Sequence, residues 1–247
     1  MKSHRLIRSF VVLAGSLGAL AAFTGVAGCA TERAGGAARL KSTMDASKQR
    51  AMTPDQGIAR LAEGNRRFVR GESLQRDLPA QRASTASGQH PFAVVLSCID
   101  SRTAPETVFD QGIGDVFSPR IAGNYANADI LGSMEFATKV AGARLIVVLG
   151  HTECGAVKGA CDDVRLGNLT TVIEAIRPAV ESVDNVRGER NSGNKQFVLA
   201  ATEANVRRTV TEIRANSEIL RELERTGAIK VVGAMYDIGS GDVVFLR

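Results

Sequence analysis

Two segments rich in metal-binding side chains each follow a short apolar run, and this arrangement constrains the fold more than any other feature. Residues 97–102 (Ser-Cys-Ile-Asp-Ser-Arg) follow the run 91–96, and residues 150–155 (Gly-His-Thr-Glu-Cys-Gly) follow the run 145–149. Apolar runs of this length are typical of buried strands. Because open α/β sheets build their sites where strands end in loops, we expect both segments at one edge of a sheet.

The apolar runs alternate with segments of helical periodicity, which predicts an α/β fold. We expect a central, parallel-rich β-sheet flanked by helices, with an N-terminal helical arm and a C-terminal antiparallel edge strand. Residues 71–90 have the polar composition of a linker. Strands are expected at 92–97, 115–121, 145–149, 229–236 and 243–246. Helices are expected at 53–65, near 105, and at 127–140, 155 onward, 168–184, 197–215 and 217–226.

The N-terminus has the layout of a secretory signal peptide. Three basic residues precede an apolar stretch at 10–26, and no acidic residue occurs before Glu32. The stretch ends in Val-Ala-Gly-Cys, which resembles a bacterial lipobox with Cys29 as the lipid-modified residue. Ordinary signal cleavage nearby is the alternative. We expect three parts: a signal peptide at 1–28, a tether at 29–52 and one folded domain at 53–247.

The formal net charge of +5 is largely a property of this leader. Residues 1–28 hold three Lys or Arg residues and no acidic residue, so the chain without them carries +2. No basic stripe interleaved with aromatic residues supports nucleic-acid binding. No Walker-type loop or G-x-G-x-x-G follows a strand, so a nucleotide enzyme has no support either. We expect an exported protein of the periplasm or cell envelope, with a lipid anchor to the membrane at Cys29.

Cys98, His151 and Cys154 together offer two thiolates and one imidazole nitrogen, which is a set of zinc ligands that leaves one position for water. A lone His-x-x-Cys is weak evidence, but the Cys-x-Asp-x-Arg segment after the preceding strand strengthens it. The alternative is a disulfide between Cys98 and Cys154, as exported domains often form. A disulfide does not require His151 or Asp100 beside it. The remaining Cys161 is expected to be a buried, small apolar residue.

Asp100 allows two interpretations from the residues alone. It can be a fourth metal ligand, or it can pair with Arg102, whose planar guanidinium matches a carboxylate. The second arrangement frees the fourth position and orients an incoming water. A surface ion pair without a role, worth under about 1 kcal/mol, is the plainest alternative.

The motifs Cys98-x-Asp100-x-Arg102 and His151-x-x-Cys154 resemble the zinc signatures of the β-class carbonic anhydrases. The resemblance covers roughly residues 53–247. The chain departs from it at Ile121, where a polar residue such as Asn is commoner. Further segments similar to the family, in family order, are 61–68, 89–91, 114–117, 120–124 and 233–237.

This resemblance implies one Zn²⁺ per chain, bound by Cys98, His151 and Cys154, and reversible hydration of carbon dioxide to bicarbonate by zinc-bound hydroxide. It implies that Asp100 is a switchable zinc ligand and that Arg102 is its partner in a catalytic dyad. Gln89 matches a glutamine that donates a hydrogen bond toward the substrate, often from the neighbouring subunit. A homodimer or higher homo-oligomer is therefore expected.

Two rival functions remain open from the sequence. A carbon disulfide or carbonyl sulfide hydrolase would share the ligands and differ in tunnel shape and assembly. An exported zinc-binding or redox module without catalysis would bind zinc, or form a 98–154 disulfide, and would have no use for a displaceable carboxylate at Asp100.

Overall fold

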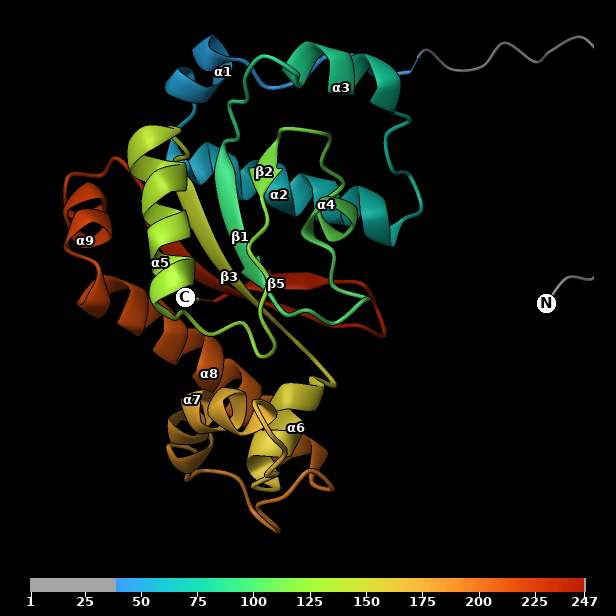
Figure 1. The fold of residues 1–247 in the computed structure, drawn as a ribbon. Coiled ribbons are helices and arrows are strands. Elements are labelled where there is room, and N and C mark those ends of the chain that lie inside the picture. Colours follow the sequence, from blue (N-terminus) through green and yellow to red (C-terminus); the bar gives the residue numbers. More distant parts are fainter. Residues whose placement is uncertain (1–38, 247) are drawn as a thin grey trace, which may run out of the picture. The chain divides into compact units, whose positions relative to one another are not determined.

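A five-stranded sheet in the order β2-β1-β3-β4-β5 organises the computed structural model, which describes residues 39–246 (Figure 1). The first four strands in this order are parallel, and β5 runs antiparallel to β4. The expected parallel-rich α/β fold with an antiparallel edge strand is confirmed. The strands are β1 (Ala93–Ser97), β2 (Val116–Phe117), β3 (Leu145–His151), β4 (Lys230–Tyr236) and β5 (Val243–Phe245).

The two central strands, β1 and β3, are buried along their whole length. Side chains on a strand alternate between the two faces of a sheet, so β3 supplies both cores. Ile146 and Val148 pack on one face, while Leu145, Val147 and Leu149 pack on the other. A strand that is covered by helices on both faces must be apolar at every position, which explains the continuous apolar runs.

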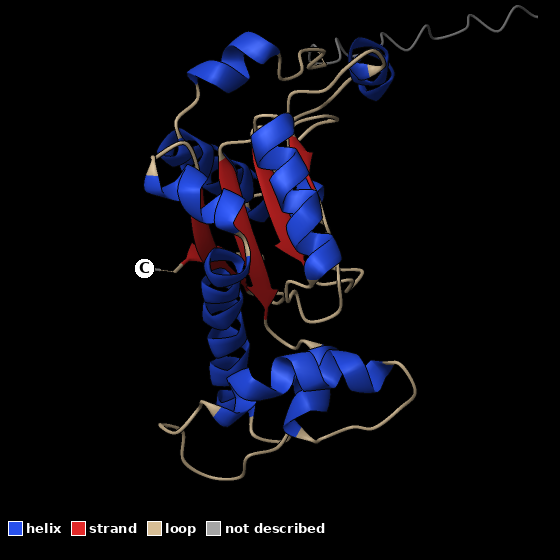
Figure 2. Ribbon diagram, turned by 60° about the vertical axis from the view of Figure 1, so that its left-hand side comes forward, coloured by secondary structure: helices blue, strands red, loops and turns tan. Residues whose placement is uncertain are grey.

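Helices cover both faces of the sheet (Figure 2). The face that Ile146 points into is covered by α5 (Ala128–Glu135), the π-helical turn Phe136–Val140, α9 (Glu218–Arg225) and the C-terminal half of α8 (Lys195–Asn216). The face that Leu145 points into is covered by α2 (Pro54–Val69) and α4 (Pro105–Val108), with α1 (Ala46–Ala51) nearby.

A third apolar cluster lies beyond the C-terminal ends of β1 and β3. It is built by α6 (Gly155–Cys161), α7 (Leu169–Glu181) and the N-terminal half of α8, which we call the helical lobe (Figure 2). Cys98 and Cys154 belong to this cluster. The long helix α8 contacts α6 and α7 as well as β3 and β4, so it joins the lobe to the sheet.

Several helices start where the local sequence predicts. The Thr53 side chain accepts a hydrogen bond from the Gln56 backbone N–H, and Gln56 reciprocates, which forms a capping box ahead of α2. The Ser217 side chain caps α9 by accepting a hydrogen bond from the Leu220 N–H. Gly227 follows the end of α9 with a left-handed φ of 74°, a conformation that glycine adopts without a steric penalty.

The folded domain begins earlier than the expected boundary at residue 53. The described part of the expected tether contains α1, and Met44 is 4% exposed within the core. The expected linker 71–90 contains α3 (Leu78–Thr85), whose Gln81 donates hydrogen bonds to the Leu40 and Ser42 carbonyls. These contacts join segments about forty residues apart. The polar composition of residues 71–90 therefore gave no sign that the segment is folded.

The expected strand 115–121 is shorter in the structure. Only Val116–Phe117 pairs as a strand with β1, and an isolated bridge joins Ser97 to Arg120. The expected signal peptide, Cys29 and the tether as far as residue 38 lie outside the described residues. Among the described helices, none combines the length and the apolar character needed to cross a membrane.

Candidate metal centre

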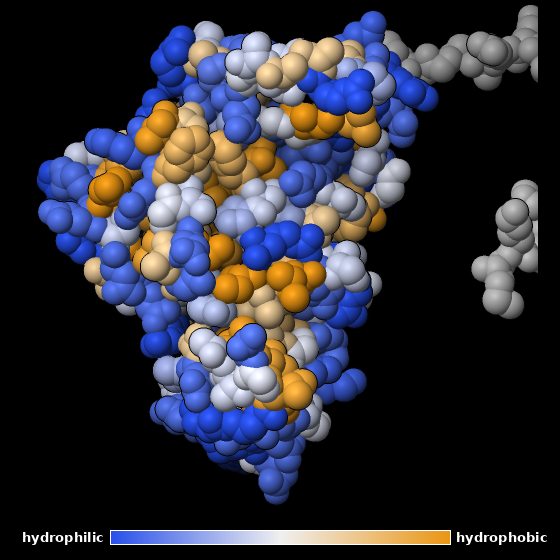
Figure 3. Space-filling view, in the orientation of Figure 1, coloured by the Kyte–Doolittle hydropathy of each residue, from blue (hydrophilic) through white to orange (hydrophobic). Residues whose placement is uncertain are grey.

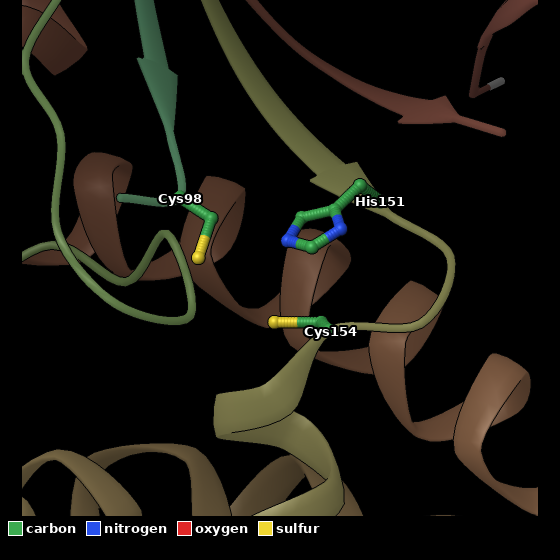
Figure 4. A group of neighbouring side chains, drawn as sticks. All are labelled: Cys98, His151 and Cys154. Atoms are coloured by element: carbon green, nitrogen blue, oxygen red, sulfur yellow. The ribbon is translucent and has the colours of Figure 1, made fainter. Parts of the chain in front are cut away.

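The ends of β1 and β3 bring three metal-binding side chains together (Figure 4). Cys98 directly follows β1, His151 is the last residue of β3, and Cys154 is the N-cap residue of α6. Their ligand atoms all lie within 4.8 Å of one another, and Figure 4 shows the two sulfurs and the ring directed toward a common point. All three residues are buried, His151 and Cys154 with no exposed surface.

A tight turn between His151 and Cys154 makes this convergence possible. Glu153 takes a left-handed φ of 61°, which turns the chain back so that Cys154 faces His151. The Thr152 N–H donates to the Tyr236 carbonyl, and the Thr152 side chain accepts from the Ile238 N–H. The Glu153 side chain itself is half exposed and pairs with Lys158. The Glu153 backbone therefore forms the turn, while its side chain makes an ion pair at the surface.

His151 has one nitrogen bonded and one nitrogen free for a ligand. Its Nδ1 lies 2.9 Å from the Thr152 carbonyl oxygen, and because a carbonyl only accepts, Nδ1 carries the proton. The Nε2 atom is buried and has no hydrogen-bond partner among the described residues. A buried nitrogen lone pair without a partner is costly, and metal coordination satisfies it.

The two thiols share one negative charge in the absence of a cation. Hydrogen bonds from the Cys154 thiol and from the Gly123 N–H lower the pKa of Cys98 to about 4, although burial opposes this. The pKa of Cys154 is raised, because its hydrogen bond to Cys98 favours its protonated form and burial disfavours a second charge. A divalent cation supplies the positive charge that lets both sulfurs ionise. Two thiolates and a neutral imidazole fit zinc.

Asp100 pairs with Arg102 at the edge of this group. Arg102 donates from Nε to Oδ1 at 2.9 Å and from Nη2 to Oδ2 at 2.7 Å. These bonds hold the pKa of Asp100 well below its ordinary value. Among the described residues, the group within 4.8 Å does not include Asp100. Of the two interpretations of Asp100, this structure contains the pair, with the Asp100 side chain 17% exposed.

Backbone carbonyls of the Cys98 loop are fixed by residues to which the sequence assigned no role. Arg120 donates from Nε to the Cys98 carbonyl at 2.9 Å and from Nη2 to the Asp100 carbonyl at 2.6 Å. The Thr103 hydroxyl lies within hydrogen-bonding distance of the same two carbonyls. The sequence offered two signals for Arg120, which lies within the expected strand 115–121 and within the family-like segment 120–124.

The loop after β2 also reaches the metal ligands directly. The Gly123 N–H donates to Cys98 Sγ at 3.4 Å. The next residue, Asn124, is fully buried with a φ of 45°, and neither of its amide atoms has a partner among the described residues. The sequence placed both residues in the family-like segment 120–124 but assigned neither a role, because the Gly123–Cys98 contact joins positions about 25 residues apart.

Gln89 lies at the opposite end of β1 from Cys98. It is exposed and precedes the strand, whereas Cys98 follows it. The five residues of β1 alone span roughly 16 Å. Within one chain, Gln89 therefore does not join the group formed by Cys98, His151 and Cys154. Cys29 lies outside the described residues. Cys161 is partly buried, and burial raises its pKa to about 11.

Comparisons with known proteins agree with this geometry. Residues 93–243 match the family model described as carbonic anhydrase. Carbonic anhydrase 2 of Mycobacterium tuberculosis is 38% identical over 193 residues, covering 74% of this chain and 88% of that protein. The carbonic anhydrase of Mycolicibacterium smegmatis is 35% identical over 192 residues, with the same coverage of 74% and 88%.

Solved structures show the same fold. The β-carbonic anhydrase CafA of Aspergillus fumigatus superposes with a TM-score of 0.59 at 25% identity, covering 78% of this chain and 90% of that one. One of two tetrameric β-carbonic anhydrases of Sordaria macrospora gives 0.59 at 25% identity, over 68% and 86%. Because the family model covers more than half of the chain and the relatives and solved structures agree with it, this chain belongs to the carbonic anhydrase family, in its β class.

Proposed function

We propose that this protein catalyses the reversible hydration of carbon dioxide to bicarbonate and a proton, with one zinc ion per chain held by Cys98, His151 and Cys154. The observation that carries the proposal is the convergence of two buried sulfurs with a buried, unpartnered His151 Nε2 next to an ionised Asp100. Zinc bound there supplies the acidity that converts water to a nucleophile at near-neutral pH. The relatives' shared name, carbonic anhydrase, supports the reaction.

Asp100 and Arg102 form the catalytic dyad of this proposal. Arg102 holds the carboxylate through both oxygens, so Asp100 stays ionised and can only accept hydrogen bonds. A fixed acceptor beside the metal orients an incoming water by taking a hydrogen bond from it. If the pair with Arg102 breaks, Asp100 is released to become the fourth metal ligand, which closes the site.

We further propose that the working form is a homodimer or larger homo-oligomer. Within one chain, Gln89 and the metal ligands lie at opposite ends of β1. Gln89 can therefore assist the substrate only at the metal site of a second copy of the chain. Within residues 39–246, the edge strand β2 pairs with β1 and has no strand on its outer side. Apolar surface lies over α5 and beside β2 (Figure 3), around a hollow of about 770 Å³ that includes Phe117 and Phe136. The Sordaria macrospora enzymes are described as tetrameric.

Export to the periplasm or cell envelope, with a lipid on Cys29, is the proposed localisation. It rests on the basic start, the apolar stretch 10–26 and the Val-Ala-Gly-Cys sequence that follows. Membrane fractionation and the mass of the mature N-terminal peptide test it. A mature chain that retains residues 1–28 in the soluble fraction contradicts it.

Stopped-flow measurement of carbon dioxide hydration, with zinc content determined on the same sample, tests the function. The expected result is one zinc per chain and a rate far above that of buffer alone. The matched control is Cys98→Ser, which removes one ligand and should lose both zinc and activity. Comparable assays with carbon disulfide and carbonyl sulfide separate the anhydrase from a hydrolase. Fully metallated protein that hydrates carbon dioxide no faster than buffer would refute the proposal.

A further inference from the structure

Helix α8 is locked against the sheet beside the metal ligands. Val206 packs into a notch made by two glycines on neighbouring strands. A Cβ atom on Gly150 would lie 2.4 Å from the Val206 side chain, and one on Gly233 would lie 2.7 Å from it. Because Gly150 directly precedes His151, this notch fixes the position of α8 relative to a metal ligand.

The residue before Val206 in α8 is a buried asparagine. Asn205 is 1% exposed and lies in the middle of a helix of 22 residues. Asparagine is a poor helix former, and burying its amide is costly unless hydrogen bonds compensate. Its Nδ2 donates to the Gly123 carbonyl oxygen at 2.7 Å. This bond is the physical reason for an amide at this position.

Gly123 connects Asn205 to the metal ligand Cys98. Its carbonyl accepts from Asn205, and its N–H donates to Cys98 Sγ at 3.4 Å. A side chain at this position would be strained, because φ is 75° and a Cβ atom would lie 2.3 Å from Ile176 Cδ1 and displace it. The two backbone hydrogen bonds of Gly123 therefore link α8 to the Cys98 sulfur.

We propose that Asn205 is a positioning residue for the metal centre: by holding the Gly123 carbonyl, it keeps the Gly123 N–H on Cys98 Sγ and so strengthens zinc binding. The inference rests on the proposed zinc site. A hydrogen bond to a thiolate ligand fixes its orientation and stabilises its charge. Loss of such outer partners typically weakens metal binding by about 10- to 100-fold.

The test compares zinc affinity in matched buried-asparagine variants of the full chain. Asn205→Leu keeps approximate size and removes the donor. Asn65→Leu is the control, because Asn65 is also buried and donates to backbone carbonyls, those of Val108 and Gly241, without contacting the metal ligands. Competition with a chelator gives the zinc dissociation constant, and thermal unfolding gives stability. The thiolate-to-metal charge-transfer band of the cobalt-substituted protein reports the Cys98 environment.

The expected result is a zinc dissociation constant raised about tenfold or more in Asn205→Leu, with an altered cobalt band. Asn65→Leu should lose stability while keeping the wild-type band and zinc affinity. Asn205→Ser, whose hydroxyl is too short to replace the bond, gives the same test if the leucine variant does not fold. Unchanged zinc affinity in the Asn205 variants overturns the inference, as does an equal loss in Asn65→Leu. A wild-type chain that binds no zinc refutes the proposed function instead.

Discussion

The Asp100 carboxylate receives three hydrogen bonds from Arg102: two from the guanidinium, at 2.9 and 2.7 Å, and one from the backbone N–H, at 3.0 Å. The guanidinium bonds are the main reason why the pKa of Asp100 lies well below its ordinary value of 3.8. Asp100 is therefore ionised throughout the neutral range. A change in activity near neutral pH must come from another group.

Arg102→Ala should lower kcat/KM for carbon dioxide hydration about 100-fold, because a catalytic group misplaced by about 1 Å can cost a factor of this size. The carboxylate then loses both guanidinium bonds and is free to move toward the metal. Arg102→Lys keeps the charge without the planar fork, so an intermediate loss is expected. Stopped-flow assays at equal zinc content measure both variants. Wild-type kcat/KM in Arg102→Ala contradicts the proposed dyad.

Removal of zinc should lead to a disulfide between Cys98 and Cys154. Their sulfurs lie within 4.8 Å of each other, and the lowered pKa of Cys98 provides a thiolate at neutral pH. Chelation followed by exposure to air should then abolish activity, with recovery only when a reductant is added together with zinc. Peptide mass analysis identifies the bond. Cys161→Ser, made as the control, should behave like the wild-type chain, and full recovery by zinc alone argues against the prediction.

Asp110→Asn should destabilise the fold by about 3 kcal/mol at neutral pH, as expected when one member of a buried ion pair is removed. The Asp110 side chain is 2% exposed and is bound by Arg67 and Arg76. Glu63→Gln is the control, because the half-exposed Glu63 side chain forms its ion pairs within the described residues with arginines of its own helix, and no measurable change is expected. Urea denaturation measures the free energy of unfolding of each variant.

The stability difference between wild type and Asp110→Asn should also depend on pH. Burial alone would raise the pKa of Asp110, but the hydrogen bonds from Arg76 and Arg67 outweigh it and hold the pKa below 3.8. Ionised Asp110 therefore stabilises the fold above that value, and the contribution is lost as pH falls through the folded-state pKa. A difference that is constant between pH 7 and pH 3 would falsify this assignment.

Substitution of two helical glycines by alanine should change the stability of the protein in opposite directions. In α2, a Cβ atom on Gly64 would lie 1.8 Å from the Phe109 carbonyl oxygen, so Gly64→Ala must displace the backbone of another segment. In α5, a Cβ atom on Gly132 meets no atom within 4 Å. Gly132→Ala should stabilise the protein by up to about 1 kcal/mol, because alanine favours the helix. Thermal unfolding compares the two, and similar shifts in both would contradict the steric argument.

Mixing two inactive variants tests whether a second copy supplies Gln89. Gln89→Ala retains the metal ligands, and Cys98→Ser retains Gln89. If sites are shared between copies, a mixed dimer has one intact site, and an equal mixture refolded together should regain about a quarter of wild-type activity. Each variant refolded alone is the control. A mixture no more active than the sum of its parts places Gln89 outside the shared site.

The sequence alone was sufficient to predict the strands, helix starts and candidate ligands that depend on residues close together in the chain. The apolar runs 91–96 and 145–149 predict two buried strands whose following loops carry Cys98 and His151. Thr53 and Ser217 mark helix starts through hydrogen bonds made within one turn. The candidate ligand set could be named from the sequence because His-x-x-Cys occurs together with Cys-x-Asp-x-Arg after a preceding strand.

Only the tertiary structure decided what surrounds those ligands. In the folded chain, Asp100 pairs with Arg102, and the Gly123 N–H donates to Cys98 Sγ. The Gly123 carbonyl accepts a hydrogen bond from Asn205, which is 82 residues away. The tertiary structure also made a helix within the polar segment 71–90 by giving Gln81 partners near residue 40. The Gly123 and Gln81 contacts share one physical reason: every residue has a backbone carbonyl and all but proline have a backbone N–H, so the sequence carries no sign of which distant group will reach them.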